Sequence, residues 1–192
     1  MANAGTPHLI LGITGASGIH GARLLAEKSP WPVDLVASQW GRRVAGTECG
    51  GIDAIETLAE RVFQPDDLYA PLASGSVPAV GMVTLPCSAH TLAQIAAGMG
   101  DSLITRAAHC QLKEHRPLIL CLRESPLTLI DLENARRAAA AGAVIMPMSP
   151  PFFMFAGTDP KKVSMDDLLD AFVDRVLALL GQSSDRTWED IR

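Results

Sequence analysis

Short, almost uninterrupted apolar runs alternate with amphipathic stretches along most of this 192-residue chain. Strands buried on both faces read as continuous apolar runs, so each run indicates a strand in a central sheet. Strands that alternate with helices predict a parallel sheet joined by right-handed crossovers. We therefore expect a single-domain α/β, Rossmann-like (flavodoxin-like) parallel sheet with helices on both faces. The predicted strands are 8–13, 33–38, 80–85, 117–122 and 143–146, and the predicted helices are 22–27, 52–61, 90–97, 104–113 and 129–140.

The length fits one domain, which we take as residues 1–192, with a core over about 8–181 and a polar tail over 182–192. Ser164 is placed to cap a final helix, and Gly181 to end it. Residues 147–162 interrupt the alternation with several prolines and phenylalanines. We expect this segment to form a lid or a subunit contact.

Composition narrows the classes of partner. A net charge of −5 argues against a nucleic-acid surface. The chain shows neither a signal peptide nor an apolar run long enough to span a bilayer, so we expect no membrane contact. The four cysteines have no spacing typical of a metal site. A cytoplasmic protein with reduced thiols and no metal is expected.

Ligands of parallel sheets bind at the carboxyl ends of the strands. The first predicted strand is followed by GITGASG and then by a helical pattern, which is typical of a phosphate-binding turn and also of a tight turn without ligand. A dinucleotide site needs an acidic residue at the end of the second strand, where this chain has Ser38. The pattern therefore favours a mononucleotide.

Two other strand ends carry polar side chains. In LPCSAHT (85–91), Ser88 and Thr91 are possible phosphate donors, Ser88 alternatively only caps a helix, and a reactive Cys87–His90 pair is conceivable. In CLRESP (121–126), Arg123 and Glu124 form either an ion pair or part of a dianion site. Three cations precede them in sequence, Arg106, Lys113 and Arg116, of which we expect Arg116 to face solvent.

Taken in order, the stretches GITGASG, SGS (74–76), GMVTLPCSAHTLAQIA, ITRAA, LKEHRPLILCLRESPL and GAVIMP resemble the UbiX-type flavin prenyltransferases over residues 8 to 181. The resemblance implies an enzyme that joins a dimethylallyl group, carried by dimethylallyl monophosphate, to reduced FMN without a metal. The product, prenylated FMN, serves a UbiD-type decarboxylase. The family also implies a homo-oligomer, with a dodecamer among the sizes expected.

The same resemblance assigns roles to individual positions. FMN is expected at Gly15, Ala16, Ser17, Ser38, Ser88, Ala89, His90, Thr91 and Arg123. The prenyl phosphate is expected at Lys113, Arg123, Phe153 and Arg175. Ser17, Glu48 and Glu124 are the expected catalytic residues.

This chain departs from the family pattern at four places. Phe153 stands where the family has a tyrosine, Val77 where it has an aromatic residue, and His90 where it has lysine or arginine, and the loop before His20 is one residue shorter. These departures keep an alternative open: a divergent FMN-binding protein without prenyl transfer, as a cofactor carrier or a decarboxylase subunit. A flavin-dependent decarboxylase or other oxidoreductase and a non-flavin mononucleotide binder are further alternatives.

Overall fold

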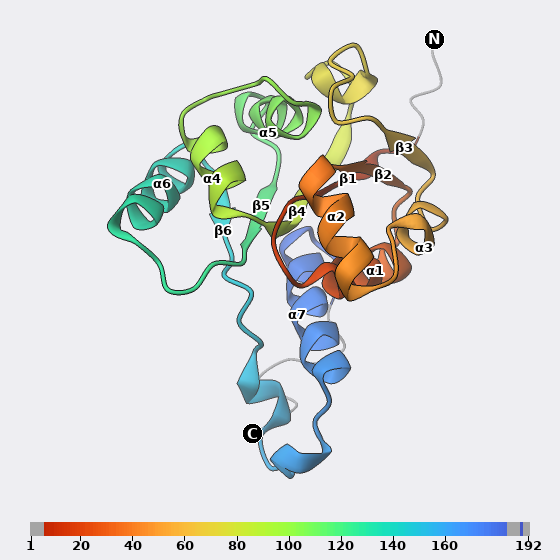
Figure 1. Cartoon of the computed structure of the whole chain (residues 1–192), viewed down its shortest axis with the longest axis vertical. Coiled ribbons are helices and arrows are strands. Elements are labelled where there is room, and N and C mark those ends of the chain that lie inside the picture. The colour runs from red at the N-terminus through yellow and green to blue at the C-terminus, as the bar shows by residue number, and fades with distance from the viewer. Residues whose placement is uncertain (1–5, 184–188, 190–192) are drawn as a thin grey trace.

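The computed structural model describes residues 6–183 and 189. Its centre is a six-stranded sheet in the order β3-β2-β1-β4-β5-β6, with every neighbouring pair parallel (Figure 1). The strands are β1 (His8–Ile13), β2 (Val33–Ala37), β3 (Arg61–Phe63), β4 (Ala79–Cys87), β5 (Leu118–Leu122) and β6 (Val144–Ile145). The predicted Rossmann-like fold is confirmed.

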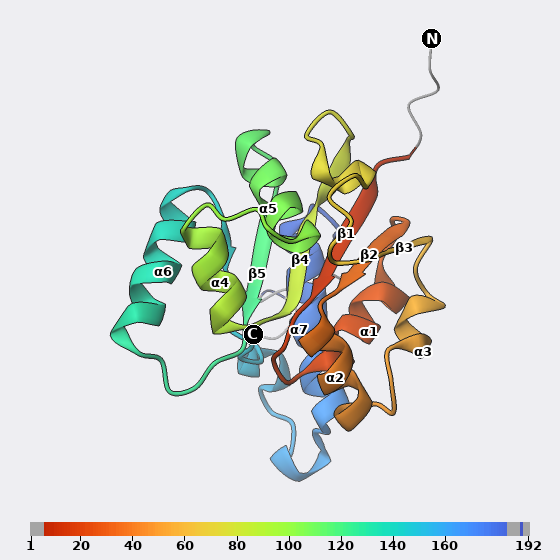
Figure 2. The same ribbon diagram turned by 45° about the horizontal axis from the view of Figure 1, so that its top comes forward.

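Helices cover both faces of the sheet (Figure 2). The α-helices are α1 (Ile19–Lys28), α2 (Gln39–Glu48), α3 (Asp53–Glu56), α4 (Ala89–Ala96), α5 (Leu103–Lys113), α6 (Leu129–Ala140) and α7 (Met165–Leu179). Side chains of α1, α2, α3 and α7 pack into one core cluster, and those of α4, α5 and α6 into the other. Leu9 and Leu11 point into the first cluster and Ile10 into the second, which explains the continuous apolar run of β1.

Two elements were not predicted. The stretch QWGRRVAGTE forms α2, yet only Gly41 and Ala45 of that helix are buried, so its sequence carries no apolar stripe. Residues 52–61, predicted as one helix, divide into the short α3 and the start of β3. The edge strand β3 is only three residues long and begins with a charged residue, Arg61, so no apolar alternation marks it.

A buried carboxylate ties the first three strands together. Asp34 of β2 is 1% exposed. Arg61 of β3 donates to both of its oxygens, at 2.7 and 2.6 Å, and Nδ1 of His8 in β1 lies 2.9 Å from Oδ1. Such bonds are stronger than those between neutral groups. They hold the short edge strand in place.

We expect Asp34→Ala to lower the free energy of unfolding by about 2–3 kcal/mol, because two charge-assisted bonds to a buried carboxylate are lost. The matched control is Glu133→Ala, which removes an exposed pair with Arg136 on α6 and should cost less than about 0.5 kcal/mol. Denaturant unfolding of the two variants measures the difference. Equal losses would show that the Asp34 network contributes no more than a surface pair.

The strand order reverses between β1 and β4, and such a switch point places a crevice at the carboxyl ends of the strands. Beyond this edge projects an arm (residues 147–164), which Figure 1 shows reaching away from the sheet. The arm contains the 3₁₀ turns Phe152–Phe155 and Pro160–Lys162. None of the helices in the described ranges, 6–183 and 189, has the length and apolar character of a membrane span. The polar tail predicted for 182–192 lies largely outside those ranges.

Candidate functional site

Two cavities open at the carboxyl edge and share the loop 15–18 that follows β1. Cavity A measures about 450 Å³ and cavity B about 460 Å³. Cavity A is lined by Gly15, Ser38, Trp40, Pro65, Ser88, His90, Thr91, Gln94, Ser102 and Ile104. Cavity B is lined by Ser17, Gly18, His20, Glu48, Cys49, Arg123, Met148, Met165 and Leu169.

A buried threonine fixes the floor between the strand ends. Thr14 is 2% exposed and donates its hydroxyl to the carbonyl oxygen of Pro86 at 2.9 Å. The same hydroxyl oxygen accepts the backbone N–H of Ser88 at 2.8 Å. The backbone N–H of Arg123 donates to the carbonyl of Cys87 at 2.9 Å. The chain segments that follow β1, β4 and β5 are therefore held together before any ligand binds.

Three helices begin at cavity A. Ser38, Ser88 and Ser102 are the N-caps of α2, α4 and α5, and each side chain accepts a backbone N–H of its own helix, at 3.0, 3.2 and 3.3 Å. The positive ends of three helix dipoles and their free N–H groups thus face one space. None of the described residues that line this cavity is acidic. Cavity A therefore suits a phosphate dianion. The capping interpretation of Ser88 is confirmed, since its side chain accepts the backbone N–H of Thr91.

The N-terminus of α1 is already occupied by a carboxylate. Glu48, at the end of α2, accepts the backbone N–H groups of Gly18 and Ile19, each at 2.9 Å. Gly18 has φ +101, a left-handed conformation that glycine adopts without strain. A phosphate bound by the GASG loop therefore faces cavity A, beside Gly15, rather than the first turn of α1. The Glu48 carboxylate already balances the positive end of the α1 dipole.

Glycine is required at position 15 for a different reason. A Cβ atom at Gly15 would lie 2.6 Å from the Cβ of Trp40, closer than side-chain carbons approach one another. The first turn of α2 therefore packs directly on the loop that separates the cavities. This contact positions Ser38 and Trp40 at the rim of cavity A.

Cavity B combines a cation with apolar side chains. Arg123 forms no ion pair with any carboxylate of the described residues, so the predicted alternative of an Arg123–Glu124 pair is not found. Met148, Met165 and Leu169 supply an apolar wall. An anion with a small apolar group fits this lining. Glu124 itself is exposed and accepts the backbone N–H of Ser125 at 3.2 Å.

Cys87 and Cys49, the two cysteines near the cavities, are poor nucleophiles. Complete burial raises the pKa of Cys87 to about 12, which excludes the reactive Cys87–His90 pair. At the rim of cavity B, burial and then the Glu48 charge raise the pKa of Cys49. All four cysteines lie in the described part of the chain and are free.

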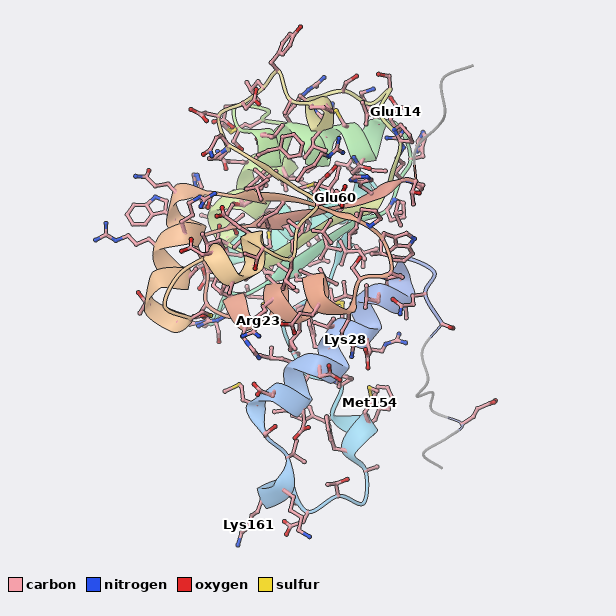
Figure 3. All side chains as sticks on the ribbon, turned by 90° about the vertical axis from the view of Figure 1, so that its right-hand side faces the viewer. Arg23, Lys28, Glu60, Glu114, Met154 and Lys161 are labelled. Carbon is pink, nitrogen blue, oxygen red and sulfur yellow. The ribbon has the colours of Figure 1, made fainter. Side chains whose placement is uncertain are left out.

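Two predicted phosphate ligands lie at the opposite edge of the sheet. Lys113 is the last residue of α5 and pairs with Glu114. Figure 3 shows Glu114 far from Met154 of the arm, toward the opposite end of the molecule. Arg175 is exposed and follows Asp174, which pairs with Lys28 at the end of α1. Within one copy of the chain, neither reaches cavity A or cavity B.

The other cations near Lys113 hold a turn. Arg116 donates to the carbonyl oxygens of Gly75 and Val77, both at 2.8 Å. Arg106 donates to the carbonyl oxygen of Ala73 at 2.9 Å. The expectation that Arg116 faces solvent is therefore wrong, and these cations are not gathered around Arg123. They fix the SGS turn before β4.

The remaining predicted residues divide between the cavities and the arm. Ser88, His90 and Thr91 line cavity A. Ala89, the first residue of α4, lies between Ser88 and His90 in the chain. Ser17 and Glu48 line cavity B, and Ala16 lies in the loop between the cavities. Phe153 is 38% exposed in the arm.

Sequence reasoning missed several lining residues, among them His20, Trp40, Gln94 and Ser102. For Ser102 a signal was available, since serine just before an amphipathic run is a common N-cap.

Comparisons with known proteins agree with this geometry. A family model described as Flavoprotein matches residues 2–177. The chain is 41% identical over 179 residues to Flavin prenyltransferase UbiX of Thermoplasma acidophilum, covering 92% of this chain and 96% of that protein. The crystal structure of AnUbiX in complex with FMN and dimethylallyl pyrophosphate matches with a TM-score of 0.85 and 34% identity, over 95% of this chain and 99% of that one. A dodecameric FMN-dependent UbiX-like decarboxylase from Escherichia coli O157:H7 matches with a TM-score of 0.84 and 34% identity, over 94% and 98%.

Proposed function

The chain belongs to the UbiX-type flavin prenyltransferase family, and we propose that it joins the dimethylallyl group of dimethylallyl monophosphate to reduced FMN, making prenylated FMN. One observation carries the proposal: two cavities of different chemistry adjoin at a single loop. Cavity A suits the phosphate of a flavin mononucleotide, and cavity B suits a small apolar phosphate. The two substrates can therefore lie against each other.

We place the FMN phosphate against Ser38, Ser88 and Ser102, where three helix N-termini replace charged side chains. Thr91 adds a hydroxyl donor, and Gly15 lets the flavin approach the loop. His90 is the one histidine among the described residues that line cavity A.

We expect Ser38→Asp to weaken FMN binding by about 100-fold or more, because it sets a carboxylate beside the phosphate. Aspartate is also a good N-cap, so α2 should remain folded. Riboflavin, which lacks the phosphate, should bind to this variant and to the wild type alike, and Ser38→Ala should lose less than about tenfold in FMN affinity. Quenching of flavin fluorescence measures all three. An equal loss for riboflavin would place the phosphate elsewhere.

The prenyl donor is assigned to cavity B. Arg123 and the Ser17 hydroxyl hold its phosphate, and a held phosphate leaves an allylic carbon more readily. Met148, Met165 and Leu169 keep water from the allyl group. Each of these roles is part of the proposal.

The remaining cations are assigned to a second copy of the chain. Lys113 and the SGS turn lie side by side at the far edge, since a Cβ at Gly75 would collide with Nζ of Lys113. In a homo-oligomer, another copy would present them, together with Arg175, to cavity B. A UbiD-type decarboxylase as recipient and a cytoplasmic location complete the proposal; the dodecameric relative supports the oligomer.

The alternative is an FMN-binding protein without prenyl transfer, which the missing hydroxyl at Phe153 and the missing aromatic ring at Val77 favour. Release of inorganic phosphate from dimethylallyl monophosphate, measured without oxygen in the presence of reduced FMN, separates the two. A transferase releases one phosphate for each flavin consumed. A carrier binds FMN and releases none.

A further inference from the structure

We propose that His20 is the general acid of cavity B, donating a proton to the phosphate oxygen that leaves the prenyl donor. This inference rests on the proposed function and names a residue that the motifs did not indicate. His20 is the second residue of α1 and lines the cavity together with Ser17 and Arg123. Its side chain is 35% exposed, so it is partly shielded from water.

The other groups in cavity B are less suited to give up a proton. Glu48 is engaged as an acceptor by the N–H groups of Gly18 and Ile19. Cys49 is a weak acid because burial and the Glu48 charge raise its pKa. Arg123 does not lose its proton in proteins. The Ser17 hydroxyl can donate a hydrogen bond but is too weak an acid to give up its proton near neutral pH.

A carboxylate of α7 holds the His20 ring in place. Nε2 lies 3.2 Å from Oδ1 of Asp166 in the first turn of α7. The charged and titratable groups around it are Asp166 from α7, Glu48 and Cys49 from the end of α2, and Arg123 after β5. Arg23, on the same helix, acts on Cys49 and pairs with Glu27. Asp166 holds Nε2, so Nδ1 is the ring nitrogen that we assign to the donor phosphate. Histidine is the side chain that most often serves as a general acid in enzymes.

The step balances as follows. The allylic C–O bond of the donor breaks, and its electron pair goes to the phosphate oxygen. That oxygen takes the proton of the His20 imidazolium, so the phosphate leaves as the hydrogen phosphate dianion. The allyl carbon then bonds to reduced FMN, which supplies the electron pair and releases a proton. Solvent returns a proton to His20 after the product leaves.

The first test compares pH profiles. Because His20 must be protonated to act, wild-type kcat should fall as the pH rises through the pKa of His20. His20→Gln should lower kcat by about 100- to 10,000-fold and lack this alkaline limb. Asp166→Asn should keep the limb, because the proposed acid is still present. His109→Gln, an exposed histidine on α5, is the matched control and should behave like the wild type.

Two further readouts separate acid catalysis from a structural role. FMN affinity of His20→Gln should equal that of the wild type, because His20 does not line cavity A. The loss should be smaller with dimethylallyl pyrophosphate than with the monophosphate, because the better leaving group needs less protonation. Calorimetry of monophosphate binding without FMN should show proton uptake in the wild type that is reduced in His20→Gln.

An unchanged pH profile in His20→Gln, or equal losses with both donors, would overturn the assignment. A loss of kcat in Asp166→Asn as large as that in His20→Gln would show that His20 acts only by holding α7 in place. Wild-type protein that forms no prenylated FMN would overturn the proposed function and this inference with it. An active wild type with an unaffected His20→Gln variant would overturn this inference alone.

Discussion

Replacing Arg123 with alanine should lower kcat/KM for dimethylallyl monophosphate by about 100- to 1,000-fold while changing FMN affinity by less than about threefold. Arg123 lines cavity B, forms no ion pair within the described part of the chain, and is absent from the lining of cavity A. Its charge is therefore available to a phosphate that leaves during the reaction. Steady-state kinetics with the donor and fluorescence titration with FMN measure the two effects separately.

The matched control is Arg136→Ala. This arginine lies on α6, is 70% exposed and pairs only weakly with Glu133 at 3.3 Å. It should leave both quantities unchanged. Arg116 is unsuitable as a control, because its loss frees the carbonyls of Gly75 and Val77. If Arg123→Ala lost FMN affinity as strongly as transferase activity, Arg123 would also belong to the flavin site, which is one of the two sites that the family resemblance gives it.

Two inactive variants, Arg123→Ala and Lys113→Ala, should restore each other's activity when they are co-expressed. The proposed site takes Arg123 from one copy and Lys113 from another, since the two lie at opposite edges of the sheet. Random mixing in equal amounts would leave about a quarter of the sites with both cations. Each variant alone should lose about 100-fold or more in kcat/KM. Separate tags allow the mixed oligomers to be purified and assayed.

The control for this experiment pairs Arg123→Ala with Ser17→Ala. Both residues line cavity B of the same copy, so a mixed oligomer contains no intact site and should stay inactive. Mixed oligomers of the first pair that remain inactive would show that Lys113 does not complete the site of another copy.

The sheet and most of its helices were predictable because continuous apolar runs are typical of strands buried on both faces. The amphipathic stretches between these runs indicate the helices. The edge strand β3 was not, since its position depends on the contact between Arg61 and Asp34, which are distant in sequence. For α2, burial of only Gly41 and Ala45 left no periodic pattern. Tertiary contacts, rather than local preference, define both elements.

The candidate site was predictable where its residues follow strands directly. Ser38, Ser88 and Arg123 come after β2, β4 and β5, and all three reach the carboxyl edge as expected. The division of the edge into two cavities was not, because it depends on Glu48 returning from the end of α2 to the N-terminus of α1. The family resemblance also assigns Lys113 to the prenyl-phosphate site, but it does not say which copy of the chain provides that lysine.

The most direct test of the account is the mass of the flavin formed when the protein, reduced FMN and dimethylallyl monophosphate are incubated without oxygen. The two cavities predict that FMN gains one five-carbon prenyl unit, that Arg123→Ala forms this product far more slowly, and that Arg136→Ala forms it at the wild-type rate. Recovery of FMN with its mass unchanged, from protein shown to bind FMN, would contradict prenyl transfer and leave a flavin-binding protein in its place.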